Sequence, residues 1–290
     1  MSDIAQELSS QPSCWETAAD LNEAFSNELP ATGERVMAVG CGTSLYMAQA
    51  YASRREAAGR GETDAFPASE APTGRDYDRV VVICRSGTTS EVIAFLDACR
   101  HPSTALVAVE DSPVAERATS VIGLAFADER SVVQTRFATS ALALLRTSLG
   151  EDIGPIIADG RDALSGPLPV DPSAFDHFVF LGKGWTIGLA NEAALKLREA
   201  CGATSESYPA MEYRHGPISL ASGRSLVWMF DPQDEELAAD VGRTGATVLS
   251  TGRDPMADLV SVHRLAVALA VSKGLDPDNP VHLTRSVVLP

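Results

Sequence analysis

Short runs of apolar and β-branched residues alternate along the chain with longer stretches of helical periodicity. Strands are predicted at Val36–Val39, Val80–Ile83, Ala105–Val109, Val121–Leu124, Phe178–Leu181, Leu226–Phe230 and Thr247–Leu249. A last amphipathic stretch, Leu259 to Val271, predicts a helix. Alternation of short strands with helices is typical of βαβ units built on a parallel sheet. The pattern therefore predicts an α/β fold.

Two such series of strands and helices are separated by a stretch of different composition. From Gly150 to Phe175 the chain holds four Gly and four Pro among polar residues, which is typical of a connection with room for one short helix. We therefore expect a helical segment at 1–34, a first α/β unit at 35–150, a linker at 151–175, a second unit at 176–279 and a tail at 280–290.

The second series repeats the first at an offset of 142 residues. Between Gly40 and Glu70, eight of 31 positions are identical to the residue 142 places later, without a gap. Two helices rich in Ala and Gly can match in part by chance, but a Pro-Ala-x-Glu motif also recurs, beginning at Pro67 and at Pro209. We therefore predict a duplicated α/β unit, with a ligand site in the cleft between the copies.

Charge and cysteine usage narrow the classes of partner and compartment. Lys and Arg number 23 and Asp and Glu number 39, so the formal charge is −16, which disfavours nucleic acid and anionic membranes. We expect no membrane-spanning helix, because no apolar run approaches the ~18 residues needed to cross a bilayer. Five widely spaced cysteines without a CxxC pair fit neither a disulfide framework nor a metal site. We expect a cytoplasmic protein without metal or other cofactor.

Small and hydroxyl-bearing residues follow two predicted strands of the first series. They form the segments Gly40–Ser44 and Cys84–Ser90. Parallel sheets bind ligands at the carboxyl ends of their strands, where Gly admits the ligand and hydroxyls and helix-start amides bind phosphate oxygens. Each segment alone also fits a turn with a helix cap, since Thr88 and Glu91 have the spacing of a capping box. The pair favours a phosphate ligand, and the absence of GxGxxG argues against a dinucleotide.

The helix expected after the second glycine turn carries charged residues on one face. Glu192, Lys196 and Glu199 are spaced i, i+4 and i+7. An exposed stripe of ion pairs, contributing about 0.3–0.5 kcal/mol per pair, is one interpretation. The other is catalytic, because the helix leads into a histidine, His215, placed before a Gly-Pro turn. A carboxylate, an ammonium and an imidazole near a cleft can move a proton between adjacent carbons of a sugar.

Four segments in this order, GCGTS, RSGTTSE, NEAALKLRE and EYRHGP, resemble the double sugar-isomerase (SIS) family. The likeness runs from about Arg35 to the tail and is strongest to the isomerase half of glucosamine-6-phosphate synthase and to stand-alone amino-sugar-phosphate isomerases and deaminases. The resemblance implies two tandem three-layer α/β/α subdomains, each with a mostly parallel sheet. It also implies a homodimer with shared active sites and a sugar phosphate as the small-molecule partner.

The resemblance further implies roles for individual residues. Phosphate binding would fall to Ser44, Ser86 and Thr89, helped by the main chain at Arg85 and Gly87, with Thr43 near the sugar hydroxyls. Glu199 matches the base that carries a proton between C1 and C2, a task that suits a raised carboxyl pKa, and Lys196 matches a lysine beside it. His215 matches a ring-opening histidine that reaches in from the neighbouring subunit. Glu129 matches a carboxylate in a segment that closes over the substrate.

Three departures from the family pattern limit what the resemblance implies for this chain. Cys84 stands where the family usually has Ser, so a weak thiol donor replaces one hydroxyl. Arg285 stands where the synthase has a lysine that forms a Schiff base, which a guanidinium cannot do; a surface ion pair is the alternative role. Only about 34 residues precede the first predicted strand, so we expect no glutaminase domain.

The residues and the resemblance together predict a phosphosugar aldose–ketose isomerase, with coupling to amination or deamination of an amino-sugar phosphate as a further option. A fructosamine-6-phosphate deglycase is the alternative within enzymes, because the same base could drive release of an amine. A non-catalytic phosphosugar sensor is the alternative from another class, because related SIS modules bind effectors in regulators.

Overall fold

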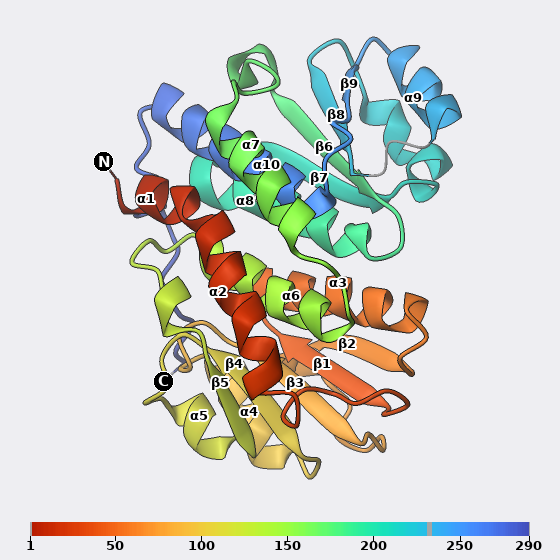
Figure 1. Cartoon of the computed structure of the whole chain (residues 1–290). Helices are drawn as coiled ribbons and strands as arrows, with labels where there is room; N and C mark the ends of the chain where they lie inside the picture. Colours follow the sequence, from red (N-terminus) through yellow and green to blue (C-terminus); the bar gives the residue numbers. More distant parts are fainter. Residues whose placement is uncertain (1, 231–233, 290) are drawn as a thin grey trace.

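Two parallel β-sheets organise the chain, as Figure 1 shows. The computed structural model describes residues 2–230 and 234–289. The first sheet has the order β2 (Thr63–Pro67), β1 (Val36–Gly40), β3 (Arg79–Ile83), β4 (Ser103–Val107), β5 (Ser120–Gly123). The second has the order β7 (Thr204–Pro209), β6 (His177–Gly182), β8 (Ser225–Met229), β9 (Thr247–Leu249). The predicted α/β class is confirmed.

Every apolar run that predicted a strand lies on one. The run at 105–109 continues two residues beyond β4, and those at 121–124 and 226–230 each continue one residue beyond β5 and β8. The prediction missed β2 and β7, the edge strands beside β1 and β6. Their sequences, TDAFP and TSESYP, lack a run of β-branched residues because each pairs on one side only and is partly exposed.

Helices cover both faces of each sheet. They are α1 (Asp3–Ser9), α2 (Gln11–Ala24), α3 (Thr43–Ala57), α4 (Ser90–Ala98), α5 (Pro113–Arg117), α6 (Arg136–Ser148), α7 (Gly154–Ser165), α8 (Thr186–Cys201), α9 (Glu235–Gly242) and α10 (Pro255–Ser272). Residues 2–34 form α1 and α2, and the Gly- and Pro-rich stretch contains α7. The predicted C-terminal helix lies within α10.

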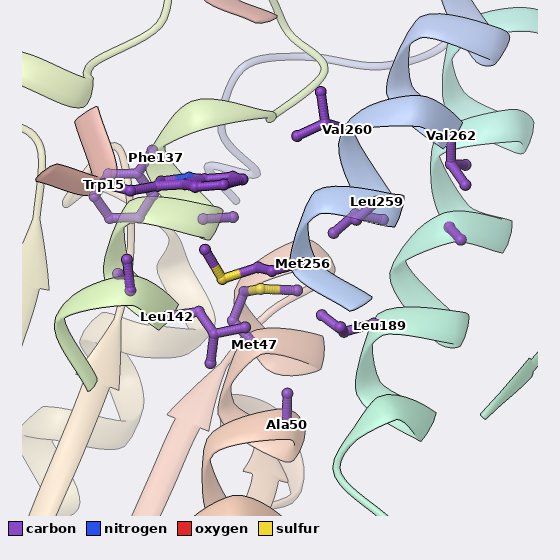
Figure 2. Packing of buried hydrophobic residues seen from close by; sticks show 14 of the residues in the cluster. Trp15, Met47, Ala50, Phe137, Leu142, Leu189, Met256, Leu259, Val260 and Val262 are labelled. Carbon is purple, nitrogen blue, oxygen red and sulfur yellow. The ribbon is translucent and has the colours of Figure 1, made fainter. Parts of the chain in front are cut away.

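The main hydrophobic core lies between the two sheets. Figure 2 shows side chains of α2, α3, α6, α8 and α10 meeting there, with Trp15 beside Phe137 and with Met47 close to Met256. The opposite face of the first sheet packs on α4 and α5, and that of the second packs on α9. One core shared by helices from both halves fixes the two sheets relative to each other.

Positions 142 residues apart occupy equivalent places and touch at the centre of the molecule. Gly40 pairs with Pro67 in the first sheet, and Gly182 pairs with Pro209 in the second. The Asn191 amide on α8 donates a 3.0 Å hydrogen bond to Gln49 on α3. A Cβ at Gly188 would lie 2.4 Å from the Tyr46 carbonyl oxygen, so glycine permits this close helix crossing. The repeat predicted from sequence therefore has matching strand register in both halves.

One helix is more apolar than the sequence analysis expected. An 18-residue window over α10 has a mean hydropathy of 1.3, so by length and composition this helix could span a membrane, contrary to that expectation. Of the window, 67% is buried inside the protein, as in the core helix of a globular fold.

Candidate active site

A cavity of about 170 Å³ opens where the two predicted phosphate loops face helix α8. Its wall comes from the β1–α3 loop, the β3–α4 loop, the segment before α6, the last turn of α8 and the C-terminal tail. The lining residues are Cys41, Gly42, Thr43, Thr89, Glu91, Val132, Gln134, Glu199, Leu283, Thr284, Arg285, Ser286 and Val287. The cavity thus brings Thr43, Thr89, Glu199 and Arg285 together, four residues selected from sequence.

The β1–α3 loop turns tightly because of its glycines. A Cβ at Gly40 would lie 2.6 Å from the Ser44 carbonyl carbon, so only glycine lets α3 begin at once after β1. Thr43, the first residue of α3, lines the cavity. Ser44 is buried one residue further on and is not among the lining residues.

The β3–α4 loop gathers three hydroxyl groups around one point. Gly87 has φ +66°, and a Cβ there would lie 2.0 Å from Ser112 Oγ, so both the backbone and the space require glycine. The hydroxyls of Ser86, Thr88 and Thr89, called here the hydroxyl cluster, lie 3.1, 3.0 and 3.4 Å from a single oxygen atom. Ser86 and Thr88 donate to that oxygen, and either oxygen of the Thr89 contact can be the donor. Three hydroxyls that converge on one point can all donate to a phosphate oxygen.

That oxygen belongs to the C-terminal tail, through the hydroxyl of Ser286. The tail continues past the loop: the Ser90 amide donates to the Val287 carbonyl at 3.1 Å, and the Leu289 amide donates to Ser90 Oγ at 2.8 Å. Sequence reasoning missed both Thr88 and Ser286 as site residues. Its only signal was the run of hydroxyls in the loop, and no spacing rule links that run to a serine 200 residues later.

The side chains of Arg85 and Glu129 are engaged within the protein. Arg85 is 2% exposed and donates to the carbonyl oxygens of Ser131, Val132 and Arg285. One Glu129 oxygen accepts from the Thr135 and Arg136 amides at 2.5 and 2.9 Å, and the other lies 3.5 Å from Arg85. This places both groups behind the cavity wall, where they tie the segment before α6 to the tail.

Arg285 lines the cavity and has a partner. Its guanidinium pairs with Asp128, and its side chain is 40% exposed. Cys84, where the family has Ser, lies with its thiol 3.6 Å from the Thr89 hydroxyl, so it supports the hydroxyl cluster from behind.

Lys196 stands at the centre of the charged face of α8. It is 1% exposed, its Nζ pairs with Glu199, and it lies 3.5 Å from Glu192 Oε1. Burial lowers the pKa of Lys196, but the two carboxylates outweigh burial and hold it above its usual value. The ammonium therefore stays charged and links the cavity-lining Glu199 to the interior Glu192.

Glu192 is the carboxyl group of this face whose environment favours the protonated form. Burial raises its pKa to about 7, against the opposing effects of Lys196 and of the Thr43 hydroxyl. Its Oε1 atom also lies 3.7 Å from Nε2 of His263 on α10. An exposed stripe of ion pairs, one interpretation of this face, does not fit because Glu192 and Lys196 are both 1% exposed.

Comparison with known proteins shows which proteins the chain is similar to. No protein-family model matches the chain. Glutamine–fructose-6-phosphate aminotransferase (isomerizing) of Sulfurisphaera tokodaii is 26% identical over 93% of this chain and 52% of its own length. Glucosamine-6-phosphate deaminase of Thermotoga maritima superimposes with a TM-score of 0.83 and 26% identity, covering 99% of this chain and all of that one. The chain is homologous to the SIS proteins.

The SIS likeness also extends to more distant solved structures. Tagatose-6-phosphate ketose/aldose isomerase of Escherichia coli, at 18% identity, shares the fold with a TM-score of 0.82 over 98% of this chain. The chain spans about half the length of the curated relatives it matches.

His215 lies apart from this cavity. It ends the 3₁₀ turn Glu212–His215 after β7, is exposed, and is not one of the residues lining the cavity. Within residues 2–230 and 234–289, no group of three or more His, Cys, Asp or Glu side chains is placed to hold a metal ion. The structure thus brings Glu199, Lys196, Thr43 and the hydroxyl cluster together and leaves His215 at the surface.

Proposed function

We propose that this SIS chain is a phosphosugar aldose–ketose isomerase. The observation that carries the proposal is one cavity lined by Thr89 of the hydroxyl cluster and by Glu199, which pairs with the buried Lys196. The hydroxyl cluster offers donors to a phosphate group, and Glu199 offers a base next to a fixed cation. An isomerase needs these two functions at separate places along one open-chain sugar, because C2 of a hexose 6-phosphate lies six bonds from the phosphorus and C1 lies seven.

The proposed reaction moves one proton between adjacent carbons. Glu199 takes a proton from C1 of a ketose, or from C2 of an aldose, and returns it to the other carbon after an enediol forms, while a second proton moves between O1 and O2 of the sugar. A negative charge develops on the sugar oxygen in this step. The buried Lys196 ammonium next to Glu199 stabilises that charge, and burial strengthens the effect because little water screens it.

Phosphate binding is proposed to require displacement of the Ser286 hydroxyl. Pockets that enclose small ligands usually measure about 300–1,000 Å³, whereas this cavity measures about 170 Å³. The tail, from Leu283 to Val287, fills part of the site. Its connections to the loops are hydrogen bonds and one exposed ion pair, which a sugar phosphate can replace with bonds of its own.

Coupling to an amino group is a finer proposal. Two of the relatives are named as a glutamine–fructose-6-phosphate aminotransferase and as a glucosamine-6-phosphate deaminase. Release or addition of ammonia at C2 would use the same proton transfer by Glu199. Arg285 cannot form a Schiff base, so we propose that it contacts the sugar as a cation. Deglycation of a fructosamine phosphate remains the alternative reaction.

A second copy of the chain is proposed to complete the site. His215 is exposed, and the exposed apolar side chains of Met211 and Leu220 flank it at 52% and 60% exposure. Such a patch beside an unused histidine suits an interface that delivers His215 to the partner's cavity. Mixing a His215→Ala chain with a Glu199→Gln chain should restore part of the activity, because mixed dimers then hold one intact site. Activity no higher than that of either variant alone would contradict the shared site.

A panel of substrates tests the proposed function. The protein is incubated with fructose 6-phosphate, tagatose 6-phosphate, glucosamine 6-phosphate and a fructosamine 6-phosphate, and the sugars, ammonia and amine formed are measured. We expect turnover of at least one ketose or amino-sugar phosphate and none of the unphosphorylated sugars. Binding without turnover of any phosphosugar would instead support a sensor.

We place this activity in the cytoplasm, in keeping with the five free cysteines.

A further inference from the structure

A chain of buried polar groups runs from helix α2 to the back of the proposed catalytic helix. The Trp15 indole donates to the Thr139 hydroxyl at 2.8 Å, and Thr139 donates to Gln11 Oε1 at 3.0 Å. Gln11 Nε2 lies 3.3 Å from Nδ1 of His263 on α10. All four residues are no more than 1% exposed. The sequence-based site assignment used none of them.

The direction of each hydrogen bond in this chain can be deduced. The Leu8 carbonyl can only accept, and it lies 3.4 Å from the Gln11 side chain, so the amide nitrogen must face it. The amide oxygen then faces Thr139, whose hydroxyl supplies the proton. Because the Gln11 nitrogen can only donate, Nδ1 of His263 must accept. His263 is thereby held as the neutral tautomer with its proton on Nε2.

The Nε2–H group of His263 faces the Glu192 carboxylate. Nε2 lies 3.7 Å from Glu192 Oε1, and neither Nε2 nor the two Glu192 oxygens has a partner within hydrogen-bond geometry. Buried polar groups without partners are rare, and Oε1 of Glu192 is the acceptor that faces Nε2. The same Glu192 Oε1 atom lies 3.5 Å from Lys196, which pairs with Glu199 at the cavity.

The surroundings keep His263 uncharged. Burial lowers its pKa to about 3, and the Lys196 ammonium acts in the same direction. The negative groups that oppose this are Glu199 and Glu129, and Glu192 faces the ring directly. A neutral donor can orient a carboxylate without competing with Lys196 for it, whereas a protonated imidazole would.

We infer that His263, held as its Nε2–H tautomer by Gln11, is a positioning residue that orients Glu192 and, through Lys196, the Glu199 carboxylate. The effect on turnover rests on the proposed function, whereas the tautomer and its contact with Glu192 do not. Groups that orient a reacting group from behind usually change activity by roughly 10- to 100-fold.

Nuclear magnetic resonance of the full-length protein, labelled with ¹⁵N at histidine, tests the tautomer. We expect His263 to remain neutral with the proton on Nε2 from pH 8 to pH 4, and its Nε2 resonance to move in Glu192→Gln. In Gln11→Met, which keeps the size of the side chain but cannot donate, the Nδ1–H form should gain population. A ring protonated on both nitrogens at pH 6, or an Nδ1–H tautomer in the wild type, would overturn the inference.

Kinetics test the positioning role. His263→Phe should lower kcat by roughly tenfold or more with little change in KM. It should also shift the acid limb of the kcat profile to higher pH, because Glu192 loses a donor that favours its ionised form. His263→Gln, which retains an N–H donor, should recover part of the rate. Ser261→Ala, a buried change on the same helix, is the control for altered packing; an equal effect from this control would overturn the role.

These experiments separate two kinds of failure. If the wild type turns over no phosphosugar, the proposed function is wrong, and the resonance measurements alone decide the arrangement of Gln11, His263 and Glu192. If the wild type is active and His263→Phe leaves both kcat and the pH profile unchanged, the positioning role is wrong while the proposed function stands.

Discussion

The hydroxyl of Ser86 lies 3.1 Å from the hydroxyl of Ser286, so the C-terminal tail occupies the place where a phosphate oxygen is expected. Thr88 and Thr89 point to the same atom. Under the proposed function, the tail and a sugar phosphate would use the same hydroxyls and compete for them.

Removing the competing oxygen should strengthen ligand binding. Ser286→Ala is expected to lower the KM for the sugar phosphate by several-fold at nearly unchanged kcat, because the tail loses its bonds to the hydroxyl cluster. Ser86→Ala should act in the opposite direction and weaken phosphate binding by about tenfold or more, since a hydrogen bond to a charged group is worth about 1.5–3 kcal/mol. Steady-state kinetics and titration with inorganic phosphate check both. Weaker binding in Ser286→Ala would contradict competition.

The conformation of the β3–α4 loop should depend on Gly87. Gly87→Ala must adopt φ +66° and places its Cβ 2.0 Å from Ser112 Oγ. We expect a loss of about 1–3 kcal/mol in the free energy of unfolding together with weakened phosphate binding. Gly59→Ala is the matched control, because Gly59 has φ +67° with nothing within 4 Å of a Cβ. Urea denaturation of the two variants separates the cost of the positive φ from the cost of the contact between the new Cβ and Ser112 Oγ. Equal losses in the free energy of unfolding would show that this contact is relieved by local movement.

Much of this arrangement could be predicted from sequence where the signal is local. Gly40 and Gly87 mark turns that follow strands, and the 142-residue repeat places α3 and α8 in equivalent positions, where Gln49 and Asn191 meet. Polar edge strands β2 and β7 gave no apolar run, so they were missed. The sequence also does not show that the side chains of Arg85 and Glu129 face each other inside the protein.

Contacts between distant segments could not be predicted. Ser286 reaches the hydroxyl cluster only because the tail runs back over the first sheet, and His263 reaches Glu192 only because α10 packs on α8. A single histidine in an apolar helix was the weak signal for the second contact. Its partner depends on the rotation of one helix against another, which residue spacing within each helix does not determine.

Glu192 should make stability depend on pH. Its folded pKa of about 7 lies above the usual 4.5, so between these values the folded state binds more protons than the unfolded state. The stabilisation that this proton binding provides is complete below about pH 4.5 and is lost as the pH rises through 7. The shift in pKa corresponds to roughly 3 kcal/mol, since each pKa unit is worth about 1.4 kcal/mol. Glu192→Gln lacks this dependence, so relative to the wild type it should be more stable at pH 8 than at pH 4.5. Urea titrations at both values check this, and a constant difference would contradict it.

A buried arginine should contribute strongly to stability. Arg146 on α6 is 2% exposed, pairs at 2.8 Å with both Glu151 and Asp254, and lies over the Trp185 ring. Because Arg146→Met leaves Asp254 without its arginine and Glu151 with Arg54 alone, it should lower the free energy of unfolding by about 3–5 kcal/mol.

An exposed ion pair gives the control for this prediction. Arg161 pairs with Glu16 at 3.1 Å, and both side chains are 60% exposed. Arg161→Met should change the free energy of unfolding by less than about 1 kcal/mol, because water screens the pair. Chemical denaturation followed by circular dichroism compares the two variants. Similar losses in the free energy of unfolding of the two variants would show that burial does not determine how much these ion pairs stabilise the fold.

Proton transfer by Glu199 is the central claim, and exchange of carbon-bound hydrogen tests it most directly. In D₂O, a sugar phosphate bound by the wild type should gain deuterium at C1 or C2, as seen by proton magnetic resonance, even where net conversion is small. Glu199→Gln should bind the same sugar phosphate and show at least about a hundredfold less exchange, in the range expected for loss of a general base. Exchange in Glu199→Gln at the wild-type rate, or none in a wild type that binds the sugar, would contradict the account.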